Sequence, residues 1–179
     1  MGRVRCFRVL PLFLFPLVAH AAEGEKTLSV GASYARFAVT QDVPTGRETV
    51  TGRGGALGLD FEHGLGESTW FRLSAQGGLY DAPEGAGFSA SATAGIVYTF
   101  DVLRYVPHLS AAVGVMALGS EGGSAPKTSA WALIELGLGV DVLRSRDASW
   151  GVTMRYASFV ADLSTFTIGP RVTWRWGYF

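Results

Sequence analysis

The chain has 179 residues, and its 15 basic and 15 acidic side chains give a net charge of zero. This balance argues against a nucleic-acid-binding surface, which needs a clustered basic patch. Hydrophobic residues make up 48% of the chain, but after the N-terminal region they are spread out rather than gathered in one run. That distribution argues against a later transmembrane helix and is typical of a membrane β-barrel.

The N-terminal segment has the pattern of a secretory signal peptide. A region with three arginines, an apolar stretch at 9–18 and the small-x-small sequence Ala19-His20-Ala21 follow one another. The apolar stretch is far shorter than the roughly 20 residues that a spanning helix needs. We therefore expect residues 1–21 to be a cleavable signal peptide and residues 22–179 to form one domain.

Cleavage would change the charge and remove the only thiol. The signal region contains three arginines and no acidic residue, so the mature chain would carry 12 basic and 15 acidic residues, a net charge of −3. Cys6 is the only cysteine and would leave with the signal. We therefore expect neither a disulfide nor a cysteine metal site.

Eight segments of the remaining chain alternate apolar and polar side chains. Successive side chains of a strand point to opposite faces, so this period of two predicts strands with unlike faces. Each segment is long enough to cross a bilayer as a tilted strand of roughly 9 to 11 residues. The segments are approximately 28–39, 54–63, 69–80, 88–101, 108–118, 131–142, 150–157 and 166–179.

The first and last segments have special features. In the first, the alternation breaks near Arg36 and Phe37, which indicates a β-bulge. In the last, aromatic residues crowd one face towards the C-terminus while arginines occupy the other. Such a strand fits a wall between lipid and a polar lumen, the inside of a barrel.

The connections fall into two sets. The segments at 64–68, 101–107 and 143–148 are short, whereas those at 40–53, 81–87, 119–128 and 159–164 are longer on average and contain more glycine and proline. Short turns on one side and long loops on the other are the asymmetry of outer-membrane barrels. An even number of strands would return both termini to the short-turn, periplasmic side.

Aromatic side chains also sort into two groups by depth, as expected for belts at the two membrane interfaces. Those near the short turns are Phe61, Phe71, Phe100, Tyr105, Trp150, Trp176 and Tyr178. Those near the long loops are Tyr80, Phe88, Trp131, Tyr156 and Phe166.

The predicted inward face carries a nearly balanced set of charges, because an unpaired charge in a low-dielectric lumen is costly. The predicted lumen network is Asp60, Glu62, Arg72, Glu135, Asp141, Arg155, Arg171 and Arg175, with Gln76 and Asp101 on the same face. An eight-stranded barrel is just wide enough for side chains to fill it. We favour a structural plug, and a narrow pore in which Glu135 and the arginines rearrange is the alternative.

The segment Ala94-Gly-Ile-Val-Tyr98-Thr-Phe-Asp101-Val-Leu-Arg104-Tyr-Val-Pro107-His-Leu-Ser-Ala-Ala-Val-Gly114-Val resembles the small outer-membrane β-barrel family of the OmpA/OmpX type. In that family a strand ends, a short periplasmic turn passes through proline, and a strand rich in glycine and alanine follows. The likeness is one of pattern and covers essentially the whole mature chain. It implies an eight-stranded antiparallel up-and-down transmembrane β-barrel.

The resemblance also implies a C-terminal assembly signal, because members tend to end in a phenylalanine read by the barrel-assembly machinery. The matching residues are Trp174, Trp176, Tyr178 and Phe179. Here Tyr178 is in phase with the preceding hydrophobic residues and Phe179 is one step off, which suggests that the two are read together.

A lipid A-modifying enzyme is an alternative for barrels of this size, because one such deacylase kind carries a His-x-Ser pair with a distant glutamate. The sequence contains His108-Leu109-Ser110 and Glu121, the residue types of a base-activated serine. By the predicted topology, however, Glu121 lies in the opposite loop, about 30 Å from Ser110 at roughly 3.3 Å per residue. The asparagine that follows the serine in that family is replaced by Ala111.

Other sites are not expected. His63 and His108 lack a third metal ligand at a useful spacing, and the glycine-rich stretch at 52–55 does not follow a strand–helix unit that could hold phosphate. We therefore predict no metal and no cofactor.

The sequence predicts a non-enzymatic protein of the outer membrane of a Gram-negative bacterium, with a structural or surface-interaction role. Its expected partners are outer-membrane lipid and, during biogenesis, the barrel-assembly machinery; we expect a monomer and no nucleic acid. A narrow channel is a further functional alternative. A soluble, lipocalin-like barrel with its apolar face turned inward is the alternative fold.

Overall fold

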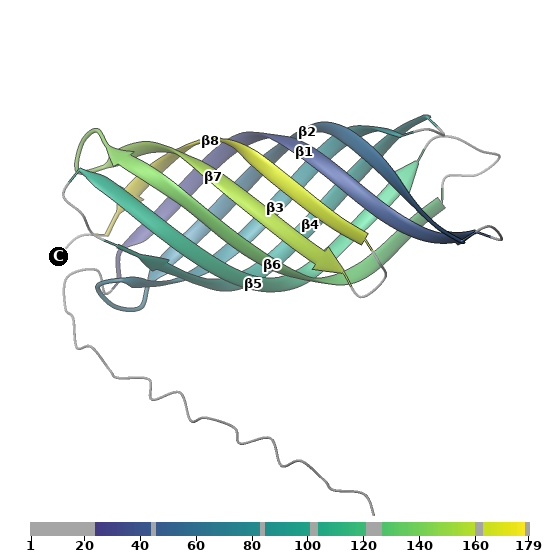
Figure 1. Ribbon diagram of the computed structural model, residues 1–179. Coiled ribbons are helices and arrows are strands. Elements are labelled where there is room, and N and C mark those ends of the chain that lie inside the picture. The colour runs from purple at the N-terminus through teal and green to yellow at the C-terminus, as the bar shows by residue number, and fades with distance from the viewer. Residues whose placement is uncertain are drawn as a thin grey trace, which may run out of the picture.

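The computed structural model describes residues 24–43, 46–82, 85–100, 104–120, 127–159 and 163–177. Within them, eight antiparallel strands form a closed barrel in which each strand pairs with the next and β1 pairs with β8 (Figure 1). The strands are β1 (Lys26–Val43), β2 (Gly46–Gly64), β3 (Thr69–Ala82), β4 (Gly85–Thr99), β5 (Tyr105–Ser120), β6 (Lys127–Leu143), β7 (Ala148–Phe159) and β8 (Leu163–Trp176). This up-and-down topology confirms the predicted fold class.

Four predictions concern residues outside the described ranges. They are the signal peptide at 1–21, the lumen position of Asp101, the loop position of Glu121, and the facing of Tyr178 and Phe179. The last strand itself ends earlier than predicted, at Trp176, and Gly177 follows with a φ of 87°. Glycine adopts this left-handed conformation readily because it has no Cβ. A positive φ is not a strand conformation, so β8 ends before Gly177.

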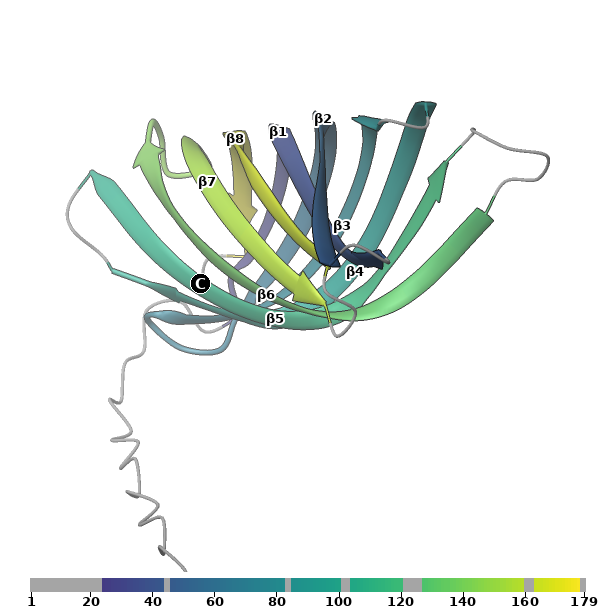
Figure 2. The same cartoon turned by 45° about the vertical axis from the view of Figure 1, so that its right-hand side comes forward.

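The barrel has two unlike ends. Strands β2, β4 and β6 end, and β3, β5 and β7 begin, at the end of the barrel where β8 finishes, and β1, β3, β5 and β7 end at the opposite one (Figure 1). Figure 2 shows the same inclined strands curving around the lumen from a second direction. By the predicted asymmetry, the end at which β8 finishes is the periplasmic end, and the opposite end is called the outer end below.

The predicted long loop at 40–53 is wrong. Strands β1 and β2 continue through this segment in register, from Lys26 paired with His63 to Val43 paired with Gly46. The segment is rich in β-branched valine and threonine, which favour strands, and these residues outweigh the few turn formers that suggested a loop.

The predicted bulge near Arg36 is also wrong. Arg36 pairs with Arg53 and Phe37 with Gly52, and the register with β8 is likewise unbroken. Arg36 faces outward and is exposed, whereas Phe37 points into the lumen and is 5% exposed. The sequence pattern breaks because the polarity of the two faces exchanges towards the outer end, not because the strand slips.

The outward face is apolar over the central part of the barrel. Leu57 and Leu79 are 68% and 73% exposed, and many other large hydrophobic side chains lie beside them. Charged residues such as Asp60 and Arg72 are buried on the inside. This is the arrangement of a membrane barrel, and it contradicts the lipocalin-like alternative, whose apolar face would line the lumen.

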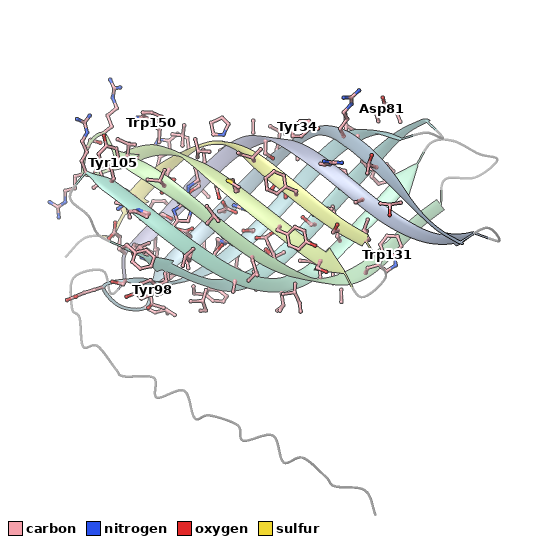
Figure 3. The ribbon with its side chains drawn as sticks, viewed as in Figure 1. Tyr34, Asp81, Tyr98, Tyr105, Trp131 and Trp150 are labelled. Carbon is pink, nitrogen blue, oxygen red and sulfur yellow. The ribbon has the colours of Figure 1, made fainter. Side chains whose placement is uncertain are left out.

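Aromatic residues mark the periplasmic end as predicted, but not the whole outer belt. Tyr105 and Trp150, which were predicted for this belt, lie near the end where β8 finishes, as does Tyr98, which was not; Trp131 lies near the other end (Figure 3). Tyr80 and Trp131, which were assigned to the outer belt, instead pack against buried hydrophobic residues inside the barrel. The lumen is apolar towards the outer end, so these rings bury more surface inside the barrel than they would at the membrane interface.

Candidate functional site

The middle of the lumen holds one cluster of buried ion pairs. Arg155 donates to an Asp60 oxygen, and the Ser74 hydroxyl donates to the other Asp60 oxygen at 2.5 Å. Arg72 Nη2 lies 3.2 Å from Glu135 Oε1, and Arg155 Nη1 lies 4.0 Å from the same oxygen. Two carboxylates and two guanidiniums therefore compensate one another in this cluster.

A second cluster lies nearer the periplasmic end and centres on Arg171. Its Nε and Nη2 donate to the two oxygens of Asp141 at 2.9 and 2.5 Å, a bidentate arrangement. Its Nη1 lies 3.7 Å from Glu62 Oε1, and the Thr27 hydroxyl donates to the other Glu62 oxygen at 3.2 Å. The Arg171 guanidinium is thus held between two acids.

The main pairs bridge strands that are not neighbours in the sheet. Asp60 is on β2 and Arg155 on β7, while Arg72 is on β3 and Glu135 on β6. In the closed strand order each of these pairs spans three steps of the sheet, so the bonds cross the lumen instead of running along its wall. The two clusters therefore tie opposite sides of the barrel together.

Arg175 is the predicted network member that the structure leaves apart. It is half-buried near the periplasmic end, and its Nε has no hydrogen-bond partner in the described part of the chain. With Arg175 included, the predicted set contains four carboxylates and four arginines, so the lumen charge sums to zero. Gln76 also faces the lumen, and its amide donates to Ser33 Oγ at 3.4 Å.

An apolar plug towards the outer end was missed by sequence reasoning. The plug consists of the buried side chains Ala35, Phe37, Ala56, Met116, Leu133, Ala157 and Leu163, with Tyr80, Leu118 and Trp131 packed against them. The Phe37 and Tyr80 rings lie 4.7 Å apart, and the Tyr80 hydroxyl donates to the carbonyl of Gly119 at 3.1 Å. Continuing the alternation of β1 without a bulge would have placed Phe37 inside.

Little space remains in the lumen around these groups. A cavity of about 30 Å³ adjoins Asp60, Arg155 and Arg171, and one of about 20 Å³ adjoins Phe37, Met116 and other plug residues. A cavity needs roughly 10–15 Å³ to hold a water molecule, so each has room for about one or two. A larger cavity of about 210 Å³ opens at the periplasmic end.

The periplasmic cavity is lined by groups of both charges, including Glu25, Glu62, Asp141, Arg171 and Arg175. Glu25 precedes β1, outside the membrane-spanning strands. Burial raises the pKa of its carboxyl above the ordinary value of 4.5, and the nearby charges of Arg175 and Arg146 oppose that rise. This carboxyl is therefore held in an environment that disfavours its ionised form.

His108 and Ser110, the candidate catalytic pair, point into the lumen. They are 2% and 7% exposed, and the Ser110 hydroxyl has no hydrogen-bond partner in the described part of the chain. Both lie on β5 opposite glycines of β6, His108 against Gly139 and Ser110 against Gly137. A serine in this position does not face the lipid that a deacylase would attack.

Two other kinds of feature are missing from the residues that the structure describes. They contain no group of three or more histidine, cysteine or acidic side chains that could hold a metal ion. They also contain no helix that is long and apolar enough to cross a membrane.

Comparison with solved structures identifies the class of fold. Neisserial surface protein A superposes with a TM-score of 0.68 and 14% identity over 85% of this chain and 99% of its own. OprG from Pseudomonas aeruginosa gives 0.66 and 10% over 88% and 98%, and Ail, the attachment invasion locus protein of Yersinia pestis, gives 0.58 and 14% over 86% and 99%. No family model and no curated protein matches the chain.

The chain is therefore an eight-stranded antiparallel barrel with the fold of these outer-membrane proteins. In fold it is similar to these small outer-membrane barrels, in agreement with the resemblance that its sequence pattern indicated.

Proposed function

We propose that this protein is a non-enzymatic integral protein of the bacterial outer membrane with a closed lumen and a structural or surface-interaction role. The observation that carries the proposal is the pair of ion clusters that cross the lumen, Asp60–Arg155 with Arg72–Glu135 and Glu62–Arg171–Asp141. The Glu62–Arg171–Asp141 cluster borders the periplasmic cavity of about 210 Å³, but beside the Asp60–Arg155 pair and the apolar plug the cavities measure only about 30 and 20 Å³. Ions do not pass through spaces of this size without moving buried side chains.

Strand β1 extends beyond the lipid band at the outer end, which supports a role at the cell surface. The 18 residues of β1 span about 56 Å at roughly 3.3 Å per residue, or about 43 Å along the membrane normal at a tilt near 40°. The lipid band of such barrels is only about 25 Å tall. The periplasmic end of β1 pairs with Trp176 in the periplasmic aromatic belt. The excess length of β1, roughly 20 Å along the membrane normal, therefore projects beyond the outer leaflet.

The names of two similar structures fit such a role. One of the similar structures is named a surface protein, Neisserial surface protein A, and another is named an attachment invasion locus protein, Ail. The projecting hairpin of β1 and β2 is the part of this chain that would meet an external partner.

Enzymatic action on lipid is disfavoured by the facing of the candidate residues. His108 and Ser110 are buried inside the barrel, and the plug and ion clusters separate them from the outer leaflet. Lipid A isolated from cells with and without the protein should therefore have the same mass. Loss of an acyl chain in the presence of the protein would contradict the non-enzymatic proposal.

Planar-bilayer recording tests the closed lumen. The wild-type barrel should show no steady ion current, whereas the variant Asp60→Ala/Glu135→Ala, which opens the central cluster, should show brief openings. A steady current through the wild-type protein would support the narrow-channel alternative instead.

Labelling of intact cells tests the orientation, because cysteine is absent from 22–179. Thr49 is exposed on the outer part of β2 and Ser145 is exposed in the turn between β6 and β7. A membrane-impermeant maleimide should modify the Thr49→Cys variant on intact cells and leave the Ser145→Cys variant unmodified until the outer membrane is opened. The reverse pattern would invert the proposed orientation.

A further inference from the structure

Two arginines lie directly opposite each other on the outward face of the barrel. Arg36 of β1 pairs in register with Arg53 of β2, and both side chains are exposed. Facing side chains on neighbouring strands lie about 5 Å apart at Cβ, and like charges in such positions destabilise a sheet. The pair is therefore unfavourable unless an anion lies between the two guanidiniums.

The protein supplies only partial compensation for this pair. Asp81 of β3 is opposite Arg53 on the outward face, and it is exposed (Figure 3). No ion pair within 4 Å joins these three side chains in the part of the chain that the structure describes. The row carries a net charge of +1, and the two guanidiniums offer donors in the geometry that binds phosphate.

The arginine pair lies at the outer edge of the lipid band. Ten residues separate Lys26, at the periplasmic belt, from Arg36, which corresponds to about 25 Å along the membrane normal at a strand tilt near 40°. That distance equals the height of the apolar band of small barrels, roughly 25 Å. On the same face of β1, exposed Tyr34 lies one step closer to the membrane centre.

An apolar groove begins one strand away from Arg36. Phe166 of β8 pairs with Arg36, and from Phe166 the groove runs across β7, β6 and β5 to β4, with a volume of about 740 Å³. Its outward-facing residues form two rows in register, Phe166–Tyr156–Leu136–Ala111–Ile96 and Met154–Leu138–Leu109–Tyr98. The small side chain of Ala111 deepens the groove between larger neighbours.

The groove descends obliquely through the outer half of the lipid band. Four strand spacings of about 4.8 Å give a length of roughly 19 Å. Because the strands tilt by about 40°, a row across them descends towards the periplasmic side by roughly 12 Å, which is close to half of the hydrocarbon thickness of about 30 Å. The lower end at Tyr98 lies near the periplasmic aromatic belt (Figure 3).

We propose that Arg36 and Arg53 bind the phosphate group of a phosphorylated outer-leaflet lipid, one acyl chain of which lies in the groove from Phe166 to Tyr98. The phosphate separates the two like charges, and the chain covers apolar surface that is unevenly packed. The inference rests on the proposed placement in the outer membrane. That placement is measured separately by the labelling of Thr49→Cys. A failure of the lipid-binding proposal can therefore be told apart from a failure of the proposed placement.

The first test measures the role of the charge. The full barrel in neutral detergent micelles is titrated with bis-phosphorylated lipid A, and bound lipid is counted by native mass spectrometry. The variant Arg36→Gln/Arg53→Gln should bind at least about tenfold more weakly, since two charge-assisted contacts are lost. The matched control Arg104→Gln/Arg144→Gln removes two exposed arginines at the periplasmic end and should change binding less than about twofold.

The second test separates a lipid site from a phosphate site. Dephosphorylated lipid A should bind the wild-type barrel about as weakly as lipid A binds the glutamine variant, and inorganic phosphate at tens of millimolar should not displace bound lipid A. The substitution Ala111→Trp fills the groove and should weaken binding severalfold, whereas Ala75→Trp on the outward face of β3 should not.

The proposal is overturned if the glutamine variant binds lipid A as wild type does, or if the dephosphorylated lipid binds equally well. It is also overturned if inorganic phosphate displaces the lipid, or if the two tryptophan variants behave alike. All substituted side chains are exposed and face outward, so the variants should fold, and heat-modifiable migration on a gel verifies this for each one.

Discussion

Removing the charge of Asp60 should destabilise the barrel strongly. Asp60 accepts hydrogen bonds from Arg155 and Ser74, and the side chains of Asp60 and Arg155 are almost fully buried. In the variant Asp60→Asn, Glu135 is the one carboxylate among the described residues that lies within 4.0 Å of the Arg72 and Arg155 guanidiniums, at 3.2 and 4.0 Å. Glu62 is opposite Arg72 in register and compensates it only from farther away. Removing one partner of a buried ion pair costs about 3–5 kcal/mol, because the remaining charge is uncompensated.

A loss of about 4 kcal/mol corresponds to roughly a thousandfold change in the unfolding equilibrium constant. The fluorescence of the five tryptophans reports equilibrium unfolding by guanidinium in phospholipid vesicles. The control Asp147→Asn removes an exposed carboxylate in the turn between β6 and β7 and should change stability by less than about 0.5 kcal/mol.

A second variant separates the effect of the orphaned charge from that of altered packing. Asp60→Asn/Arg155→Met removes both charges of the pair, so it should be more stable than Asp60→Asn alone. The reasoning is refuted if Asp60→Asn costs less than about 1 kcal/mol, or if the double variant loses the sum of the two single losses. Either result would mean that water in the lumen screens these charges.

Three further outcomes can be measured in the same unfolding assay. Phe37→Ala should cost about 3–5 kcal/mol, because it empties the centre of the apolar plug; a cost below 1 kcal/mol would mean that the plug is loosely packed. Leu57→Arg lies near the middle of the lipid band and should cost about 2–4 kcal/mol, whereas Thr51→Arg, beyond the band on the same face of β2, should cost about 0–1; equal costs would misplace the band. Glu25→Gln should raise stability slightly at pH 7 and leave it unchanged below pH 4.5, since the raised pKa makes the ionised carboxyl unfavourable only as pH rises; destabilisation at pH 7 would reverse this sign.

The period of two was sufficient to predict the strands, because a membrane barrel must keep apolar side chains outward over the whole lipid band. Leu57, Leu79 and Trp174 are all exposed as the alternation required. The inward position of residues such as Arg72 and Asp141 followed from the same pattern. Which acid pairs with which arginine did not, because partners such as Asp60 and Arg155 are 95 residues apart and meet only across the closed lumen.

The outer third of the barrel was predicted poorly for one physical reason. From the outer edge of the lipid band onwards the outward face leaves the hydrocarbon, so Arg36 and Arg53 replace leucines there, while Phe37 and Leu133 fill the inside. The rule that apolar residues face out therefore reverses along a single strand. In the sequence this reversal looks like a break in register. It led to the predicted bulge and to the outer-belt positions predicted for Tyr80 and Trp131.

The bonds across the lumen have a consequence for how the barrel forms. A hairpin, or a sheet of four successive strands from β1 to β4, contains Asp60, Glu62 and Arg72 but none of their principal ion-pair partners on β6, β7 and β8. Within such a partial sheet Glu62 is opposite Arg72, but the close ion pairs of these side chains form only when β1 meets β8. Closure of the sheet and desolvation of its charges should occur in one concerted step, and half-assembled barrels should not accumulate.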